Sequence, residues 1–403
     1  MRGVRAGGQA ELIVGLSLVV CCCAAGQASA PVPADRFVEL RRYLDHEVAA
    51  GAFPGGVVVV GHRGRVVLSY AFGHYGENDP RPTTDSTIYD LASLTKVVGL
   101  TTVTMMLLAD GRLDLEAPVG RFLPEYAEGA RSQVLVRHLL LHDAGLPDWR
   151  PLYREADDPA AALALALGTP LDTIPGARYT YSDLGAIALA QVVERVAGER
   201  LDALLERLLF VPLGMRDTRF LPPESWRPRI APTERDPWRG RVLRGEVHDE
   251  NAARLGGVSG HAGLFSTGPD LARFAFWLLD LYHGRTPDAG PPVPWPVVRV
   301  FTQRFGEPAG SSRALGWDTP SAGSSSGRCL GPEAFGHTGF TGTSIWADPR
   351  RELVVILLTN RVHPTRENNL IRRVRPAVAD LAVAAVLGPA ACPPRVDTVP
   401  GPS

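Results

Sequence analysis

Two β-rich segments lie at opposite ends of the chain, and the long stretch between them has the apolar spacing of helices. Near the N-terminus, β-branched runs are joined by His62-Arg63-Gly64, which predicts a hairpin with a short turn. Near the C-terminus, two more apolar runs flank Asp348-Pro349-Arg350-Arg351, again a strand, a turn and a strand. The predicted strands are 56–61, 65–72, 344–347 and 353–358.

The helical stretch covers about residues 89–273, and a further helix is predicted beside each β-rich segment. We therefore predict an α+β fold, in which an antiparallel sheet from both chain ends is flanked by helices and a mostly helical region is inserted. A ligand would lie in the groove between the sheet and the inserted region. The predicted helices are 35–50, 94–108, 184–196, 201–209 and 367–387.

Composition indicates a soluble globular protein without a strong electrostatic field. The chain has 403 residues, of which 45% are hydrophobic and 21% charged, and its formal net charge is -1. Such a balance, with no basic tract, argues against nucleic acid or an anionic membrane surface as a partner. We expect a small substrate, and a chain that acts as a monomer.

The first thirty residues have the pattern of a secretory signal. Arg2 and Arg5 precede an apolar run over 12–25, and Ala28-Ser29-Ala30 supplies the small residues of a cleavage site. We predict a signal peptide over 1–30, one domain over 31–388 and a tail over 389–403. We expect export to the periplasm or medium and no stable membrane insertion. A retained anchor helix is the alternative.

The cysteines leave two questions open. Cys21, Cys22 and Cys23 lie inside the predicted signal, but Val20 stands where lipid attachment would need a small residue, so we do not expect lipidation. The mature part keeps Cys329 and Cys392, which could pair in an oxidising compartment or remain as two inert thiols.

Ser93-Leu94-Thr95-Lys96 opens one of the predicted helices. Residues three apart share a helix face, so Ser93 and Lys96 can touch, and the helix dipole favours negative charge near the serine. A serine hydroxyl needs a neighbouring base to act as a nucleophile, and a desolvated lysine with a lowered pKa can serve. By itself such a motif is common by chance.

Two further motifs follow in order. Tyr181 and Asp183 stand two residues apart just before an apolar helix, within Tyr179-Thr180-Tyr181-Ser182-Asp183-Leu184-Gly185. Phe335-Gly336-His337-Thr338-Gly339-Phe340 precedes the C-terminal strand pair.

With these three motifs the chain resembles the serine penicillin-recognising superfamily, which includes class C β-lactamases, D-alanyl-D-alanine carboxypeptidases and related esterases and amidases. The family pattern is Ser-x-x-Lys, Tyr-x-Asn and Lys-Thr-Gly. The resemblance runs from about residue 37 to 387 and includes the stretches 107–115 and 136–147. It implies a β-lactamase/transpeptidase-like fold.

The resemblance also implies roles for individual residues. Ser93 would attack a carbonyl carbon, Lys96 would take its proton, and Tyr181 would shuttle protons to the leaving group and from water. The backbone N–H groups of Ser93 and Phe340 would form the oxyanion hole. Asp183, His337, Thr338 and Gly339 would contact the substrate.

Two positions depart from the β-lactamase pattern. Asp183 replaces the usual Asn and cannot donate to a substrate carbonyl unless protonated. His337 replaces the usual Lys and offers a charge that depends on pH near neutrality. Both changes favour the esterase, amidase and peptidase branches, where His-Thr-Gly is frequent.

Residues 247–263 form a polar, Gly-rich cluster that resembles a segment in a cell-wall-associated branch of the family. We expect His248 and Asn251 to line the groove. The cluster also contains metal-ligand types, including His261, but their spacing matches no standard site, so we expect no metal and no cofactor. Structural roles are expected for a last group of side chains, His138, His142, Trp149, Trp226 and Trp238.

The leading hypothesis is an acyl-enzyme hydrolase that acts on an amide or ester of a peptidoglycan-derived peptide or a similar small compound. A class C-like β-lactamase would use the same residues but deacylate a penicilloyl enzyme quickly. The third hypothesis is a penicillin sensor, which is acylated without turnover.

Overall fold

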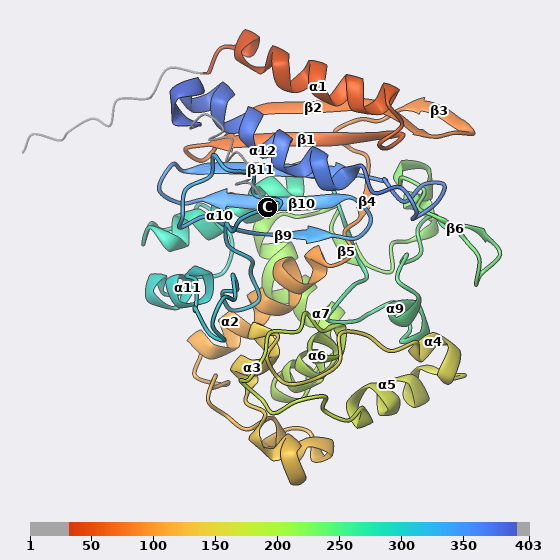
Figure 1. Cartoon of the computed structure of the whole chain (residues 1–403), viewed down its shortest axis with the longest axis vertical. Helices are drawn as coiled ribbons and strands as arrows, with labels where there is room; N and C mark the ends of the chain where they lie inside the picture. Colours follow the sequence, from red (N-terminus) through yellow and green to blue (C-terminus); the bar gives the residue numbers. More distant parts are fainter. Residues whose placement is uncertain (1–31, 393–403) are drawn as a thin grey trace, which may run out of the picture. The chain divides into compact units, whose positions relative to one another are not determined.

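The computed structural model describes residues 32–392, so the predicted signal peptide and the last residues of the predicted tail lie outside it. The main sheet has six strands in the order β3-β2-β1-β11-β10-β9 (Figure 1). Strands from the two chain ends meet at its centre, where β1 and β11 pair antiparallel with Val58 opposite Leu357. The strands are β1 Gly55–His62, β2 Arg65–Gly76, β3 Asp79–Pro82, β9 Phe335–Gly339, β10 Thr343–Asp348 and β11 Leu353–Thr359. The predicted α+β fold is confirmed.

Strand β1 is apolar on both faces because both faces are covered. Val57 and Val59 point into the core shared with the inserted helical region. Val58 and Val60 point into the opposite core, which is formed with helices α1 (Val38–Ala49) and α12 (Ile371–Leu387). In Figure 1 these two helices lie together on one side of the sheet.

Helix α10 (Gly268–Tyr282) covers the other face and contacts β1 and β11. The remaining helical region is longer than predicted, since it continues through α10 and α11, and short strands interrupt it. The α-helices are α2 Thr102–Ala109, α3 Val136–Leu141, α4 Leu152–Glu155, α5 Pro159–Gly168, α6 Asp183–Ala197, α7 Leu201–Leu205, α8 Val211–Leu213, α9 Glu250–Arg254 and α11 Trp295–Thr302. The short strands are β4 Tyr89–Asp90, β5 Arg219–Phe220, β6 Arg235–Asp236, β7 Arg241–Val242 and β8 Leu264–Ser266. Turns of 3-10 or π type are η1 Ala34–Phe37, η2 Lys96–Thr101, η3 Val119–Arg121, η4 Pro124–Tyr126, η5 Gly129–Gln133, η6 Glu206–Phe210, η7 Glu224–Arg229 and η8 Pro389–Ala391.

The C-terminal helix starts later than its apolar pattern suggests. Residues 367–370 were predicted as helix, but α12 begins at Ile371. The carbonyl groups of Arg366 and Asn368 instead accept hydrogen bonds from the guanidinium of Arg361. The Asn368 side chain in turn accepts the N–H of Leu370. These local bonds hold the segment in an irregular conformation that competes with a helix.

The chain end is tied back to the body of the protein. Cys329 and Cys392 form a disulfide, which resolves the alternative left open by the sequence. Both cysteines contact the core on the α1 and α12 side of the sheet. No helix among residues 32–392 combines the length and the hydropathy that a membrane crossing requires.

Candidate active site

Ser93 lies at the start of a buried helix, one residue before its first helical residue, Leu94. The helix passes through the π-helical turn η2 and continues as α2. Lys96 lies in its first turn, and its Nζ atom donates a hydrogen bond of 2.9 Å to Ser93 Oγ. Ser93 is partly exposed, whereas Lys96 is buried. The nucleophile candidate therefore opens to solvent while its neighbour lies beneath it.

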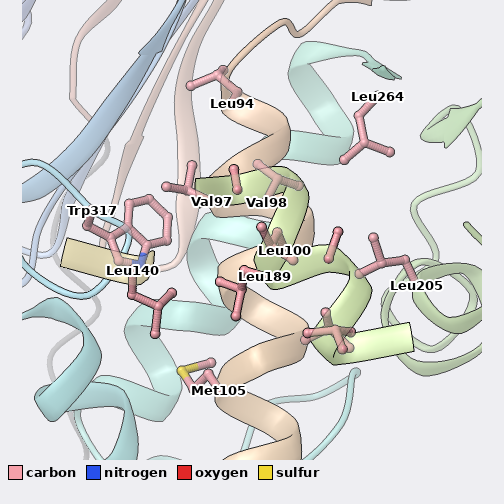
Figure 2. Close-up of a cluster of buried hydrophobic side chains, with 14 of the residues drawn as sticks. Leu94, Val97, Val98, Leu100, Met105, Leu140, Leu189, Leu205, Leu264 and Trp317 are labelled. Carbon is pink, nitrogen blue, oxygen red and sulfur yellow. The ribbon is translucent and has the colours of Figure 1, made fainter. Parts of the chain in front are cut away.

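The helix is fixed in place by apolar side chains on all sides. Figure 2 shows Leu94, Val97 and Val98 on this helix among side chains from other elements. Those partners belong to one core cluster and include Leu140, Leu189, Leu205, Leu264 and Trp317. A close-packed surrounding of this kind leaves Lys96 little freedom to move away from Ser93.

The turn before Ser93 is held by a buried carboxylate. Asp90 accepts the N–H of Ala92 at 2.8 Å and the N–H of His248 at 2.6 Å. Ala92 has a φ of 46°, a left-handed conformation that a non-glycine residue adopts at a cost of about 1 kcal/mol or more. Burial raises the pKa of Asp90 although these hydrogen bonds oppose the shift. Asp90 thus stabilises the strained turn that presents Ser93.

The end of strand β9 lies against the same turn. A Cβ atom on Gly339 would lie 2.3 Å from the carbonyl oxygen of Leu91, so only glycine fits at this position. The hydroxyl of Thr343 bonds to that carbonyl at 3.0 Å, and Thr341 bonds to the carbonyl of Asp90 at 2.7 Å. The next residue, Phe340, therefore begins beside the segment that leads to Ser93.

Within residues 32–392, no hydrogen bond is found for the N–H of Ser93 or of Phe340. Two unpaired backbone donors beside a serine can stabilise the negative charge of a tetrahedral intermediate. Thr338, one residue before Gly339, is partly exposed and can meet a bound substrate.

Lys96 forms a close ion pair with Asp183, with Nζ 2.7 Å from Oδ1. Its Nζ also donates to the main-chain carbonyl of His261 at 3.1 Å. Burial alone lowers the pKa of Lys96, but the Asp183 carboxylate and Tyr181 outweigh it and hold the pKa above the ordinary value of lysine. The expectation of a lowered pKa was therefore wrong. The pKa of Lys96 is raised because the ionisable Asp183 stands where the family pattern has a neutral Asn.

A second carboxylate and an imidazole complete this side of the site. His261 Nε2 lies 2.8 Å from Asp249 Oδ1, and its Nδ1 lies 2.8 Å from Ser259 Oγ. Donor atoms of Asp183, Asp249 and His261 lie within 4.8 Å of one another, so the group has ligand types for a metal ion. The Lys96 ammonium already lies 2.7 Å from Asp183 and neutralises one of the two carboxylates.

Tyr181 lies between the lysine and two histidines. The ammonium of Lys96 is 4.9 Å from the centre of its ring. The rings of His142 and His337 are centred 4.6 and 5.9 Å away. His142 ends helix α3 in a left-handed conformation, and its Nδ1 accepts the N–H of Ser182 at 3.1 Å. His142 thus positions the Tyr-x-Asp segment, a role that its sequence context did not reveal.

His337 is buried and uncharged. Burial, together with the cations Arg313 and Lys96, holds the pKa of His337 well below its usual range. Its Nδ1–H donates to the carbonyl of Thr338 at 2.8 Å, which leaves Nε2 as an acceptor. That Nε2 atom is buried and has no partner within residues 32–392. The expectation of a pH-dependent positive charge at His337 was wrong, because the site keeps the ring desolvated beside other cations.

A fixed positive charge is present nearby at Arg313, which the sequence motifs did not mark. Its carbon Cζ lies 5.2 Å from the centre of the Tyr181 ring and 5.4 Å from that of Tyr179. Its Nε donates to the Tyr179 hydroxyl at 3.0 Å, a neutral acceptor and not a carboxylate. Its Nη1 is buried and has no partner within residues 32–392. The segment that carries Arg313 packs closely against the helix that begins after Ser93. A Cβ atom on Gly316 of this segment would overlap Thr101 on that helix.

Two residues expected to contact substrate, His248 and Asn251, are bonded within the protein. His248 is buried, and its Nε2 lies 2.9 Å from Glu234 Oε2. Asn251 is buried, its Oδ1 accepts the N–H of Tyr153, and its amide donates to the carbonyl of Arg150. These hydrogen bonds give both side chains a structural role, and the expectation that they also line the groove stays a prediction.

The fold and the Ser-Lys-Tyr constellation define a serine hydrolase of the β-lactamase type. The family model for Beta-lactamase matches residues 40–379, and the chain belongs to this family. It is 30% identical over 368 residues to the N-acetylmuramyl-L-alanine amidase of Bacillus subtilis, covering 79% of this chain and 80% of the relative. It is 29% identical over 409 residues to a putative D-alanyl-D-alanine carboxypeptidase of Escherichia coli K12, covering 86% of this chain and 90% of the relative.

Solved structures agree on the fold. A penicillin-binding protein homologue from Caulobacter crescentus superimposes with a TM-score of 0.70 at 22% identity, covering 89% of this chain and 99% of the other. A class C beta-lactamase superimposes with a TM-score of 0.71 at 17% identity, covering 89% and 98%.

Proposed function

We propose that this protein hydrolyses an amide in a cell-wall-derived peptide through an acyl-enzyme on Ser93, and that the peptide carries a carboxylate near the scissile bond. The observation that carries the proposal is the contact between Ser93 and Lys96 in a site where Arg313 has no carboxylate partner within residues 32–392. A substrate carboxylate would pair with the half-buried guanidinium, whose Nη1 atom has no partner among those residues.

The proton balance follows from the ion pair. In the free enzyme the Lys96 ammonium donates to Ser93 and pairs with Asp183. When substrate excludes water, Lys96 passes one proton to Asp183 and becomes the base. Ser93 Oγ then bonds to the carbonyl carbon, the carbonyl electrons move to the oxygen held by the N–H groups of Ser93 and Phe340, and the serine proton moves to Lys96.

Collapse of this intermediate breaks the C–N bond. The leaving nitrogen takes a proton from Tyr181, which regains one from Lys96. The oxygen of a water molecule then bonds to the acyl carbon, and one proton of that water moves through Tyr181 to Lys96. The bond between Ser93 Oγ and the acyl carbon breaks, Ser93 Oγ takes this proton from Lys96, and the proton held by Asp183 returns to Lys96. Tyr181 suits this relay because its ring contacts Lys96 and is held by His142.

The neutral His337 separates this site from the β-lactamase pattern, in which a lysine supplies a positive charge at the same position. A carboxylate would find no positive charge on this ring, so Arg313 is the group that would bind it.

The proposed location is outside the cytoplasm. The Cys329–Cys392 disulfide is the supporting observation, because such bonds persist in oxidising compartments. We also propose that the protein acts as a monomer on a small peptide, with no nucleic-acid or membrane partner.

The test is a substrate panel read by mass spectrometry. It contains a muropeptide with a free terminal carboxylate, the same peptide with an amidated end, a chromogenic cephalosporin and a nitrophenyl ester. We expect turnover of the first peptide, a trapped acyl mass on Ser93, and loss of both in Ser93→Ala. Faster turnover of the cephalosporin would favour a β-lactamase, and stable acylation without turnover a sensor.

A further inference from the structure

Two guanidinium groups hold the backbone of the turn between strands β9 and β10, which carries one of the two proposed oxyanion donors. Arg375, on helix α12, donates from Nη2 to the carbonyl oxygens of Gly339 and Thr343 at 2.5 and 2.9 Å. Arg361 donates from Nε to the carbonyl oxygen of Phe340 at 2.8 Å. The turn is therefore fixed by side chains that carry positive charge.

The hydrogen bond from Arg375 reaches the same peptide group as the proposed donor. The carbonyl oxygen of Gly339 and the N–H of Phe340 belong to one amide, in which resonance links the oxygen to the nitrogen. A hydrogen bond accepted by the oxygen draws electron density from the nitrogen and makes its N–H a stronger donor. The oxygen also accepts the N–H of Gly342 at 3.1 Å, but the bond from a cation polarises the amide more strongly.

The charge of Arg375 is not cancelled by a carboxylate. Within residues 32–392 its hydrogen bonds go to carbonyl groups, and its Nε atom is buried without a partner. Burial and the neighbouring Arg361 lower the pKa of Arg375 to about 9, which leaves the guanidinium charged at neutral pH. A desolvated cation without a counter-charge destabilises a fold, so its position beside the site indicates a functional role.

The two proposed oxyanion donors have different electrostatic surroundings. The N–H of Ser93 lies at the N-terminal end of a helix, where the helix dipole favours negative charge. Phe340 instead follows the last residue of strand β9, and a strand has only a small dipole. The second donor therefore depends on a nearby charge for a comparable positive potential, and Arg375 lies in the position to provide it.

We propose that Arg375 polarises the peptide group between Gly339 and Phe340 and thereby strengthens the Phe340 N–H as an oxyanion donor. Negative charge develops on the substrate oxygen only as the tetrahedral intermediate forms, so the contribution is largest at that stage. Arg375 is a positioning residue, since it acts through the backbone and not on the substrate. The inference rests on the proposed function, because it requires acyl transfer at Ser93.

The test measures the stability of an oxyanion on Ser93 without turnover. A peptidyl trifluoromethyl ketone labelled with carbon-13 at its carbonyl adds to the serine hydroxyl as a hemiketal, and the carbon-13 chemical shift follows ionisation of the hemiketal oxygen. We expect Arg375→Gln to raise the pKa of this oxygen by about 1 unit, because the anion loses a nearby positive charge. Arg375→Lys keeps the charge and should stay within about half a unit of the unaltered protein.

Steady-state kinetics provide a second measurement. For a nitrophenyl ester, kcat should fall about tenfold in Arg375→Gln, the rate equivalent of one pKa unit. KM should change by less than about threefold, because the donor acts mainly on the intermediate.

Arg372→Gln is the matched control, because Arg372 is exposed on the same helix, and its hemiketal pKa should not change. Urea midpoints show which variants are folded. Arg375→Met is a second neutral variant that should fold, since an apolar side chain needs no counter-charge, and it should raise the hemiketal pKa as Arg375→Gln does. An unchanged pKa in the folded neutral variants, or an equal rise in Arg375→Lys, would overturn the proposal.

These outcomes separate the role of Arg375 from the proposed function. If the unaltered protein forms no hemiketal on Ser93, the proposed function fails and the role of Arg375 fails with it. If the hemiketal forms and its pKa does not depend on residue 375, only the role of Arg375 fails. If the pKa responds but the substrate panel shows no peptide hydrolysis, the role of Arg375 stands and the peptide assignment fails.

Discussion

Lys96 and Asp183 form an ion pair in which Nζ lies 2.7 Å from Oδ1, at the point where the family pattern places a neutral asparagine. The pair keeps the base candidate protonated in the free enzyme, since Asp183 outweighs the effect of burial on the pKa of Lys96. In the proposed mechanism, activation of Ser93 therefore includes the loss of a proton from Lys96, which Asp183 accepts.

The first prediction concerns Asp183→Asn. Without the carboxylate, burial dominates and the pKa of Lys96 falls, because desolvation disfavours the charged amine. Lys96 nevertheless loses the internal acceptor of its proton and must release that proton to solvent before it can act as the base. The ascending limb of the kcat/KM profile against pH should therefore move toward alkaline pH, to the pKa of Lys96 in the variant. Asp217→Asn, which breaks the ion pair with Arg229, is the control and should leave the limb unchanged. An acid shift in Asp183→Asn would contradict this role.

The second prediction concerns Arg313→Gln. Loss of a charged hydrogen-bond donor should lower kcat/KM for a carboxylate-bearing peptide about 10- to 100-fold, since such bonds contribute about 1.5–3 kcal/mol. The C-terminally amidated peptide should change by less than about threefold. Arg304→Gln, at an exposed position nine residues earlier in the chain, is the control. Equal losses on both peptides would show that Arg313 is structural.

The sequence predicted the sheet and the order of the motifs because both depend on local patterns. The unbroken run of valines on β1 predicts a strand covered on both faces, and the three-residue spacing of Ser93 and Lys96 predicts that they share one helix face. The roles of His142 and Arg313 could not be predicted in this way. Each acts through contacts with Tyr181, and those contacts exist only after distant segments have packed together.

The two wrong electrostatic expectations have a similar origin. The sequence identifies a residue as lysine or histidine, but it does not show how deeply the side chain is buried or which charged groups lie beside it. Burial shifts the pKa of His337 downward, and the same effect on Lys96 is reversed by one carboxylate. The sign of such shifts follows from tertiary structure alone.

The third prediction concerns the disulfide. The bond joins residues that are 63 apart in sequence, so the Cys329→Ser, Cys392→Ser double variant should lose about 2–4 kcal/mol of unfolding free energy. Its kcat should stay near that of the unaltered protein, because both cysteines contact the core on the α1 and α12 side of the sheet. Urea unfolding with and without reductant measures the loss. Reductant should destabilise the unaltered protein and leave the double variant unaffected.

The last prediction concerns stability as a function of pH. His337 stays neutral in the folded protein because burial lowers its pKa, whereas in the unfolded chain it gains a proton below about pH 6.5. Below about pH 6.5 the unfolded state therefore binds more protons than the folded state. The contribution of His337 to stability is complete above this pH and is lost as the pH falls below it. The slope is at most about 1.4 kcal/mol per pH unit for this residue. We expect His337→Gln to show a shallower fall in urea midpoint between about pH 6.5 and 5. His46→Gln, at a side chain that is 70% exposed, should keep the full slope. An unchanged slope in His337→Gln would mean that the imidazole ring takes up a proton in the folded protein. His337 would then not be the neutral group that is assigned to the site.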